Sequence, residues 1–178
     1  MKGVIFMWKQ NRPHIELEST PVERLLITLS ISIYVLWIGW LVWTWPTLPA
    51  ELPAHFGLEG EVNRWGSKWE LVMLPGISGI LGAFMLWLRN KPEWHNYPVN
   101  ITEENAPFYY RLSRNLLVWI TFVIVAGFAW ISWDVVQIAT GKSTLLSGWF
   151  MPLFLTGTFA PVVYFFYKMF RYQSATKS

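Results

Sequence analysis

Four long apolar segments constrain this chain more than any other feature. Each has close to the ~20 residues that a helix needs to cross the hydrocarbon core of a bilayer. They run over residues 25–45, 71–88, 116–138 and 147–170. Lipid offers no hydrogen-bond partner to backbone N–H and C=O groups, so each segment must be helical. The pattern predicts an all-α integral membrane protein, in which four transmembrane helices form a single domain over residues 1–178. A structured extracytoplasmic loop is expected between helices 1 and 2.

Composition excludes several classes of protein. Charged residues make up 14% of the chain, against about a quarter in ordinary soluble domains. Because cysteine is absent, no disulfide or thiolate chemistry is available. The net charge of +3 is placed at the ends of the apolar segments rather than on one soluble face, so nucleic acid is not an expected partner. The lipid bilayer is the partner that the composition indicates.

The basic residues predict the orientation. Eleven of the 14 Lys and Arg residues precede the first segment, lie between the second and third, or lie in the last turn of the fourth and after it. The other two loops hold only Arg64, Lys68 and Lys142. Loops rich in Lys and Arg stay in the cytoplasm, so both termini are predicted to be cytoplasmic. The loop 46–70 is then extracytoplasmic, and many of the 13 tryptophans lie near the outer face, where their rings fit the membrane interface.

Two sequence patterns indicate helix starts. Thr20, Pro21 and Glu23 fit an N-cap, a first helical residue and a capping-box partner. The first helix should therefore begin before the apolar segment itself. Thr102 opens the sequence TEEN and is suited to an N-cap, which predicts that a helix begins there and continues into the third segment.

The second segment carries small residues at helical spacing. Ser78 with Gly82, and Gly79 with Ala83, are pairs of small residues four positions apart, which let another helix approach closely. Packing within this protein and self-association both fit the pattern, so the oligomeric state stays open.

Asp134 is the one acid within a predicted membrane segment. An intramembrane acid is a functional hypothesis by default. Its place near the outer end of the segment, beside Trp133, fits a water-accessible interfacial acid equally well. It is also a candidate partner for Arg64 or Lys68 of the outer loop.

The loop from Pro46 to Glu70 has the most varied chemistry in the chain. Its prolines stiffen the backbone and its glycines permit turns, so a few side chains would be presented from a rigid structure. Loops also carry function more often than cores do. The residues expected to bind a ligand or partner are His55, Phe56, Arg64, Trp65, Lys68 and, from the third segment, Asp134.

A metal or catalytic site is the weaker interpretation of this loop. His55 with Glu59 and Glu61 offers one nitrogen and two oxygens, whereas a zinc site usually has more nitrogen or sulfur ligands. A structural histidine bonded to the loop backbone is favoured. The sequence contains no H-E-x-x-H, G-x-S-x-G or phosphate-binding P-loop motif. We therefore expect no metal, no cofactor and no enzymatic activity. An enzyme would need a catalytic group to form near the outer face from His55, Glu59, Glu61, Ser67 or Asp134.

Two stretches carry a family resemblance. The outer loop contains LPAELPAHFGLEGEVNRWGSK over residues 48–68, and the middle loop contains NYPVNITEENA over residues 96–106. Together they resemble a bacterial membrane-protein family of unknown function whose domain is shared with SdpI-type immunity and signalling proteins. Asn63 stands where that family often has an acid. The resemblance implies a place in the bacterial cytoplasmic membrane. SdpI-type proteins are longer, confer immunity to a secreted antimicrobial peptide, and hold a repressor at the membrane.

Three functions fit the sequence. The first, which we favour, is a non-enzymatic recognition, immunity or signalling module that binds a secreted peptide or another membrane protein through loop 46–70. The second is an accessory subunit of a larger membrane complex such as a transporter. The third is a membrane-embedded enzyme or a transporter in its own right. In the middle loop, the residues expected to organise the backbone or to contact an intracellular partner are Asn96, Tyr97, Pro98 and Asn105.

Overall fold

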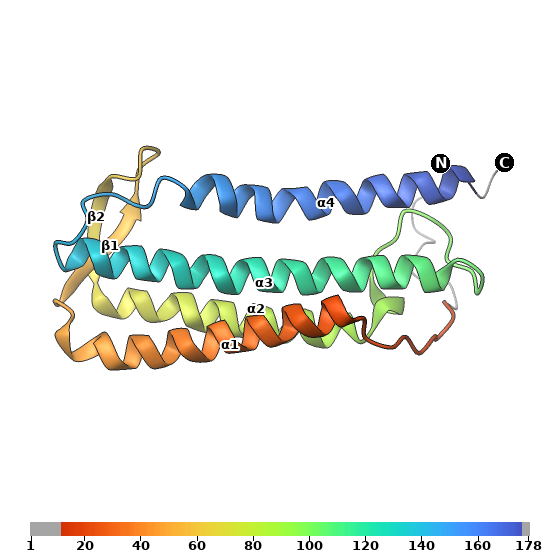
Figure 1. The fold of residues 1–178 in the computed structure, drawn as a ribbon, viewed down its shortest axis with the longest axis horizontal. Helices are drawn as coiled ribbons and strands as arrows, with labels where there is room; N and C mark the ends of the chain where they lie inside the picture. The colour runs from red at the N-terminus through yellow and green to blue at the C-terminus, as the bar shows by residue number, and fades with distance from the viewer. Residues whose placement is uncertain (1–11, 176–178) are drawn as a thin grey trace, which may run out of the picture.

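Four long helices form the body of the protein in the computed structural model, which describes residues 12–175. They are α1 (Pro21–Thr44), α2 (Met73–Arg89), α3 (Ala106–Ala139) and α4 (Phe150–Ala175). Each is long and apolar enough, with any adjoining turn, to cross a membrane, which confirms the four predicted segments. The helices run side by side, and the start of α1 and the end of α4 lie at the same end of the bundle (Figure 1). We call this the terminal end and the opposite end the hairpin end.

The start of α1 follows the predicted capping pattern. The Thr20 hydroxyl accepts a hydrogen bond from the Glu23 N–H at 3.1 Å, and the Glu23 carboxylate accepts one from the Thr20 N–H at 2.8 Å. These bonds satisfy backbone donors that would otherwise be free at a helix N-terminus. α1 ends at Thr44, and a 3₁₀ turn over Trp45–Thr47 follows.

The predicted start of α3 is wrong by one turn. α3 begins at Ala106 with Asn105 as its N-cap residue, while Thr102 lies in a preceding turn. The Asn105 side chain accepts a hydrogen bond from the Thr102 N–H at 2.9 Å and donates one to the Asn100 carbonyl at 3.0 Å. Pro107 favours the observed start, because proline has no N–H to satisfy in the first turn of a helix.

The stretch predicted as a loop contains a β-hairpin, so the prediction of an all-α fold is wrong here. β1 (Glu51–Phe56) pairs antiparallel with β2 (Val62–Ser67). Pro53 lies within β1 opposite Trp65, and proline is tolerated in such edge strands because one side of the strand is unpaired. Gly60 turns the chain between the strands with a φ of 83°, a conformation that suits glycine because it has no Cβ.

α3 is the central element of the bundle. It packs against α1, α2 and α4, whereas α1 and α2 contact each other only sparsely. Figure 1 shows α3 between α4 and the other pair. α3 has 34 residues, which span about 50 Å at roughly 1.5 Å per residue. That length exceeds the ~30 Å hydrocarbon core of a bilayer, so α3 is long enough to extend beyond it.

Buried side chains gather at both ends of α3. The terminal-end cluster consists of Tyr97, Ile101, Ala106, Tyr109, Tyr110, Phe165 and Met169. The hairpin-end cluster consists of Trp37, Leu41, Leu48, Leu52, Leu71, Val135 and Val136. Leu52 of β1 thus shares one buried cluster with Val135 and Val136 of α3. Removal of this apolar surface from water attaches the hairpin to the helices.

Candidate functional site

His55 and Asn63 form a pair on the exposed side of the hairpin. The His55 Nδ1 atom lies 2.6 Å from the Asn63 Oδ1 atom, and both side chains are exposed. The bond joins β1 to β2 through side chains, so the interpretation of His55 as bonded to the loop backbone is wrong. Because the Asn63 side chain is an amide, the imidazole has an uncharged partner.

Arg64 forms a two-pronged salt bridge with Glu70. Its Nη2 and Nη1 atoms lie 2.8 Å and 3.3 Å from the two carboxylate oxygens. The hydrogen bond to this carboxylate raises the pKa of the Arg64 guanidinium, because it stabilises the charged form. The pair attaches β2 to the 3₁₀ turn Lys68–Val72. It also neutralises much of the charge that Arg64 would otherwise present to a partner.

Lys68 lies against an aromatic cluster where the hairpin joins the helices. Its ammonium group is 5.0 Å from the centre of the Trp45 ring, which is a cation–π distance. The Trp45 and Trp69 rings are themselves 5.0 Å apart. Lys68 is therefore half-buried and positioned by an indole ring, rather than extended into solvent.

Trp65 and Phe56 have different surroundings. Trp65 of β2 keeps 50% of its surface exposed. Phe56 of β1 is half-buried and packs against the hairpin-end cluster. Of the two aromatic residues, Trp65 is accessible to a partner, whereas Phe56 supports the hairpin from within.

Asp134 holds the connection between α3 and α4 in place. Its side chain is buried, and its Oδ2 atom accepts a hydrogen bond from the Ser147 N–H at 2.9 Å. Arg64 and Lys68 have the other partners described above. The predicted pairing of Asp134 with either cation is therefore wrong, and this acid acts on the backbone of a loop instead.

The α3–α4 connection also contacts the turn of the hairpin. The Leu146 N–H donates a hydrogen bond to the Gly60 carbonyl at 3.0 Å, and Glu61 forms an isolated β-bridge with Leu145. Asp134 binds the backbone of Ser147, the residue after Leu146. Asp134 therefore supports the hairpin turn indirectly. The hairpin is thus held both at its turn and, through its buried leucine, in the core.

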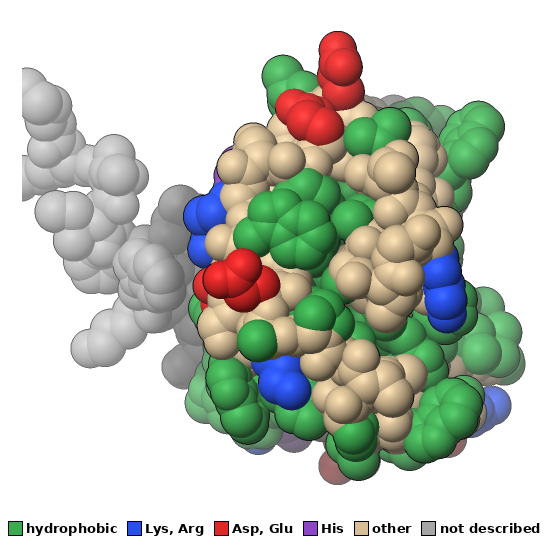
Figure 2. Space-filling model, turned by 90° about the vertical axis from the view of Figure 1, so that its left-hand side faces the viewer, with side chains coloured by type: hydrophobic (Ala, Val, Ile, Leu, Met, Phe, Trp, Pro, Cys, Tyr) green, Lys and Arg blue, Asp and Glu red, His purple; other side chains and the backbone are tan. Residues whose placement is uncertain are grey.

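We use the name hairpin face for six of the exposed side chains of the hairpin and of the turn after it. Its members are His55, Leu58, Asn63, Arg64, Trp65 and Trp69. Leu58 at the turn is fully exposed. Figure 2 views this end of the molecule and shows hydrophobic side chains in patches between scattered acidic and basic ones. Exposed apolar groups rimmed by polar residues are typical of surfaces that bind proteins or membranes.

The side chains that the enzyme alternative requires have structural partners of their own. His55 is bonded to Asn63, Asp134 is buried below the loop, and Glu61 accepts a hydrogen bond from the Glu59 N–H at 3.0 Å. Within residues 12–175, no group of three His, Cys, Asp or Glu side chains is placed to hold a metal ion. The acids near the turn shape its backbone.

The terminal end holds a buried cluster of three charges that the sequence analysis missed. Glu23 of α1, Arg89 of α2 and Arg114 of α3 expose only 2%, 8% and 6% of their surfaces. The Glu23 Oε1 atom lies 3.5 Å from Arg89 Nε and 3.3 Å from Arg114 Nε. One carboxylate therefore joins three helices. Buried charges are found almost only when they are paired in such a way.

Both guanidinium groups also bind the segment before α1. Arg114 donates a hydrogen bond to the Leu17 carbonyl at 2.6 Å, and Arg89 donates one to the Ser19 hydroxyl. A signal for the cluster exists in the sequence, because an acid and two arginines lie at the same predicted end of three membrane segments. In the sequence, Glu23 is already explained as a capping residue and the two arginines as charges that set the orientation. Neither explanation requires the three side chains to pair.

The middle loop is organised around Tyr97. Its side chain is fully buried; its hydroxyl donates to the Pro92 carbonyl at 3.0 Å and lies 2.6 Å from the Ser113 hydroxyl. Burial raises the pKa of Tyr97, since it disfavours the charged phenolate, so the hydroxyl keeps its proton. Asn96 and Pro98 on either side are exposed and accessible to a partner.

His95 packs beside Tyr97 in the same loop. Its Nδ1 atom lies 2.9 Å from the Ser113 hydroxyl and its Nε2 atom 2.9 Å from the Leu88 carbonyl oxygen. Burial lowers the pKa of His95, because the imidazolium form is poorly solvated there. The Arg12 guanidinium donates to the His95 carbonyl and lies 5.3 Å from the centre of the Tyr97 ring. The loop is thus a folded structure on the ends of the helices.

A comparison with known protein families covers the hairpin. Residues 32–79 match the model of a family described as a domain of unknown function (DUF1648). The match includes the second half of α1, the whole hairpin and the first turns of α2. The predicted resemblance to a family of unknown function is confirmed for this part of the chain.

A relative extends the similarity beyond that domain. An uncharacterized protein of Archaeoglobus fulgidus is 29% identical over 124 residues, which cover 61% of this chain and 67% of that protein. No solved structure matches the chain. Neither description assigns an activity, so the hairpin and the chemistry of its surface are the features that indicate a function.

Proposed function

We propose that this chain is a non-enzymatic recognition protein of a cell membrane, and that the hairpin face binds a secreted peptide or another membrane protein. The proposal depends chiefly on Trp65, which is half exposed on a strand next to Arg64. Tryptophan and arginine are among the residues that most often anchor protein interfaces. A tryptophan that served only to support the hairpin would be expected on its buried side.

The attachment of the hairpin supports binding rather than simple anchoring in the membrane. Leu52 is buried beside α3, and the hydrogen bond between Leu146 and Gly60 fixes the turn. A surface that is ordered before a partner arrives loses less conformational entropy on binding. The salt bridge from Arg64 to Glu70 further restricts the side chain of the residue that precedes Trp65 in β2.

The charge distribution supports an extracytoplasmic position for the hairpin face. On that side the face would meet secreted peptides, the kind of molecule against which SdpI-type proteins confer immunity. The loop sequence resembles those proteins, so immunity to a secreted antimicrobial peptide is the most specific form of the proposal. Signalling through a bound membrane partner is its broader form.

A groove between α1 and α2 favours the second candidate function, an accessory subunit of a larger membrane complex. The groove has a volume of about 200 Å³, and its small or hydroxyl-bearing lining residues are Ser30, Tyr34, Ser78, Gly79, Gly82, Ala83 and Thr121. The buried Ser78 hydroxyl has no hydrogen-bond partner within residues 12–175, although buried hydroxyls normally have one. The small residues of the groove would let a helix of another subunit approach closely.

Photocross-linking in native membranes tests the recognition proposal. A photoreactive phenylalanine analogue at position 65 is expected to capture one discrete partner, which mass spectrometry identifies. The same analogue in place of Asn100, exposed in the middle loop, is the control for the opposite end. Arg64→Ala in the chain labelled at position 65 should reduce the yield of the captured species.

The position of capture distinguishes the two functions. An analogue in place of Ile31, which lines the groove between α1 and α2, reports a subunit of a larger complex. Capture at position 31 but not at position 65 would favour the accessory subunit. Identical products from positions 65 and 100 would contradict recognition by the hairpin face.

A further inference from the structure

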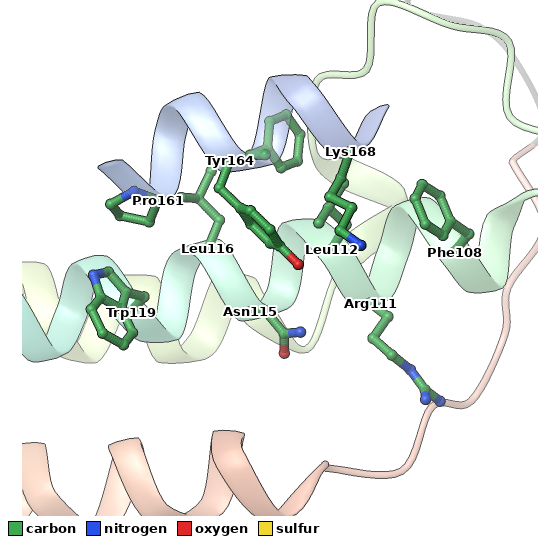
Figure 3. A pocket seen from close by; sticks show the side chains of 10 residues that line it. Phe108, Arg111, Leu112, Asn115, Leu116, Trp119, Pro161, Tyr164 and Lys168 are labelled. Carbon is green, nitrogen blue, oxygen red and sulfur yellow. The ribbon is translucent and has the colours of Figure 1, made fainter. Parts of the chain in front are cut away.

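α3 and α4 leave a groove of about 330 Å³ between them near the terminal end. Most of its wall is apolar, and its polar side chains come from both helices. Figure 3 shows the Lys168 ammonium and the Tyr164 hydroxyl pointing from α4 toward α3; Arg111 leaves α3 at the same end of the groove, with its guanidinium extended away from α4. Trp119 and Pro161 lie toward the other end of the groove. The groove therefore has a charged end and an apolar end.

The groove carries two cations and no acid. Arg111 and Lys168 line it, and its other lining residues are uncharged. Within residues 12–175, neither cation forms a salt bridge. The Lys168 ammonium lies 5.5 Å from the centre of the Tyr164 ring, which orients the amine without neutralising it. Two positive charges at the mouth of an apolar groove attract an anion that also has an apolar part.

The groove crosses the depth at which lipid headgroups meet acyl chains. Arg111 precedes Trp119 by about 12 Å along α3, at roughly 1.5 Å per residue. At the deep end, the Trp119 indole N–H donates to the Gly157 carbonyl of α4 at 2.9 Å. The uncharged part of α3 begins after Arg114, at Asn115 and Leu116. Arg111 therefore lies at the membrane border, while Trp119 lies beside the acyl chains.

We propose that this groove binds one anionic phospholipid. Its phosphate contacts the Arg111 guanidinium and the Lys168 ammonium, and an acyl chain lies against Leu112, Leu116 and Pro161. Basic pockets between transmembrane helices bind anionic headgroups through this combination of charge and shape. An inorganic phosphate would occupy only the charged end, and a second copy of the chain would bring no phosphate, so a lipid is the occupant that fits both parts.

Native mass spectrometry of the full chain tests the proposal. The purified protein is mixed with phosphatidylglycerol or with phosphatidylcholine of the same acyl chains, and the lipids that remain bound are counted. Arg111→Gln combined with Lys168→Gln is expected to lower the affinity for phosphatidylglycerol about fivefold for each cation removed. Binding of phosphatidylcholine should not change.

A matched control removes the same charge from the same end of the molecule. Lys91→Gln combined with Arg171→Gln changes two cations that do not line the groove, so phosphatidylglycerol binding should remain as in the wild type. Leu116→Trp fills the groove without altering its charge and should also release phosphatidylglycerol. The proposal is overturned if the wild type retains both lipids equally, if the control loses as much lipid as the groove variant, or if a dimer without lipid is the species observed.

Discussion

Glu23 serves two structures at once. One of its carboxylate oxygens closes the capping box with Thr20, and the other lies between Arg89 and Arg114. The first role is predictable from the sequence, because capping partners are three residues apart. The second role is not, because the two arginines belong to other helices. Only the packing of α1 and α2 on α3 brings them to the same carboxylate.

Glu23→Gln is expected to lower the free energy of unfolding by about 3 kcal/mol. Glutamine preserves the capping box, so the loss reports the removed charge, which leaves two buried guanidinium groups unpaired. Denaturant unfolding of the purified protein in detergent measures the change. Glu103→Gln removes an exposed acid at the same end and should change the stability by less than about 0.5 kcal/mol. Equal effects of the two substitutions would contradict a structural role for the buried cluster.

His95 is expected to make the protein less stable in mild acid. Its pKa in the folded protein lies below the ordinary value of 6.5, because burial disfavours the charged imidazole. As the pH falls below about 6.5, the unfolded chain takes up a proton at this site before the folded protein does. The contribution to stability is therefore complete above that pH and is lost progressively as the pH falls through the lowered pKa.

Melting temperatures measured from about pH 7.5 down to about pH 5.5 test the contribution of His95. His95→Asn should flatten the decrease in melting temperature relative to the wild type, even if the variant is less stable throughout. His55→Asn changes an exposed histidine and should keep the wild-type slope. If His95→Asn has the same slope as the wild type, this histidine does not carry the pH dependence.

Among the elements, the hairpin is the one that sequence patterns miss. Pro49 lies just before β1 and Pro53 lies within it. Proline-rich stretches are typical of loops. A two-stranded sheet tolerates Pro53 because each strand has an unpaired edge. Such a sheet is only marginally stable by itself. It forms here because Leu48 and Leu52 are buried against the helices, and that attachment is tertiary structure, which no local pattern predicts.

The contact between α3 and α4 depends on Gly127. A Cβ atom at this position would lie 2.5 Å from two ring atoms of Phe154, so a larger side chain must displace that ring. Gly127→Leu is expected to destabilise the protein by about 2 kcal/mol through overpacking, measured by thermal unfolding in detergent. Gly39→Leu in α1 is the matched control, because no atom lies within 4 Å of a Cβ there. A similar melting temperature for both variants would show that α4 is not packed at this point.

For the whole molecule, the sequence predicts the helices better than their arrangement. The four segments are recognisable because a bilayer-crossing helix needs about 20 apolar residues. Small residues indicate that another helix approaches closely, but they do not predict which helix it is. In the structure, Gly79 faces Tyr34 of α1 and Gly82 faces Thr121 of α3. These contacts lie within the chain and support the first of the two interpretations of the small-residue pairs.

The orientation of the whole molecule is testable with single cysteines, because the chain has none of its own. The distribution of Lys and Arg predicts that Leu58→Cys in the hairpin turn reacts with a membrane-impermeant maleimide in intact cells. Asn100→Cys in the middle loop should react only after the membrane is permeabilised. Both positions are exposed, so access to the reagent decides the result. The reverse pattern of labelling would place the hairpin in the cytoplasm.

The cluster of Glu23 with two arginines has a consequence for biogenesis. α1 is synthesised first, so Glu23 reaches the membrane border before the ribosome has made Arg114. Until α2 and α3 are inserted, the nascent chain carries an acid whose buried partners do not yet exist. A chain truncated before α3 would keep that charge only partly compensated. The cluster therefore closes only when the third helix has arrived, so the N-terminal end of α1 is fixed late in the assembly of the bundle.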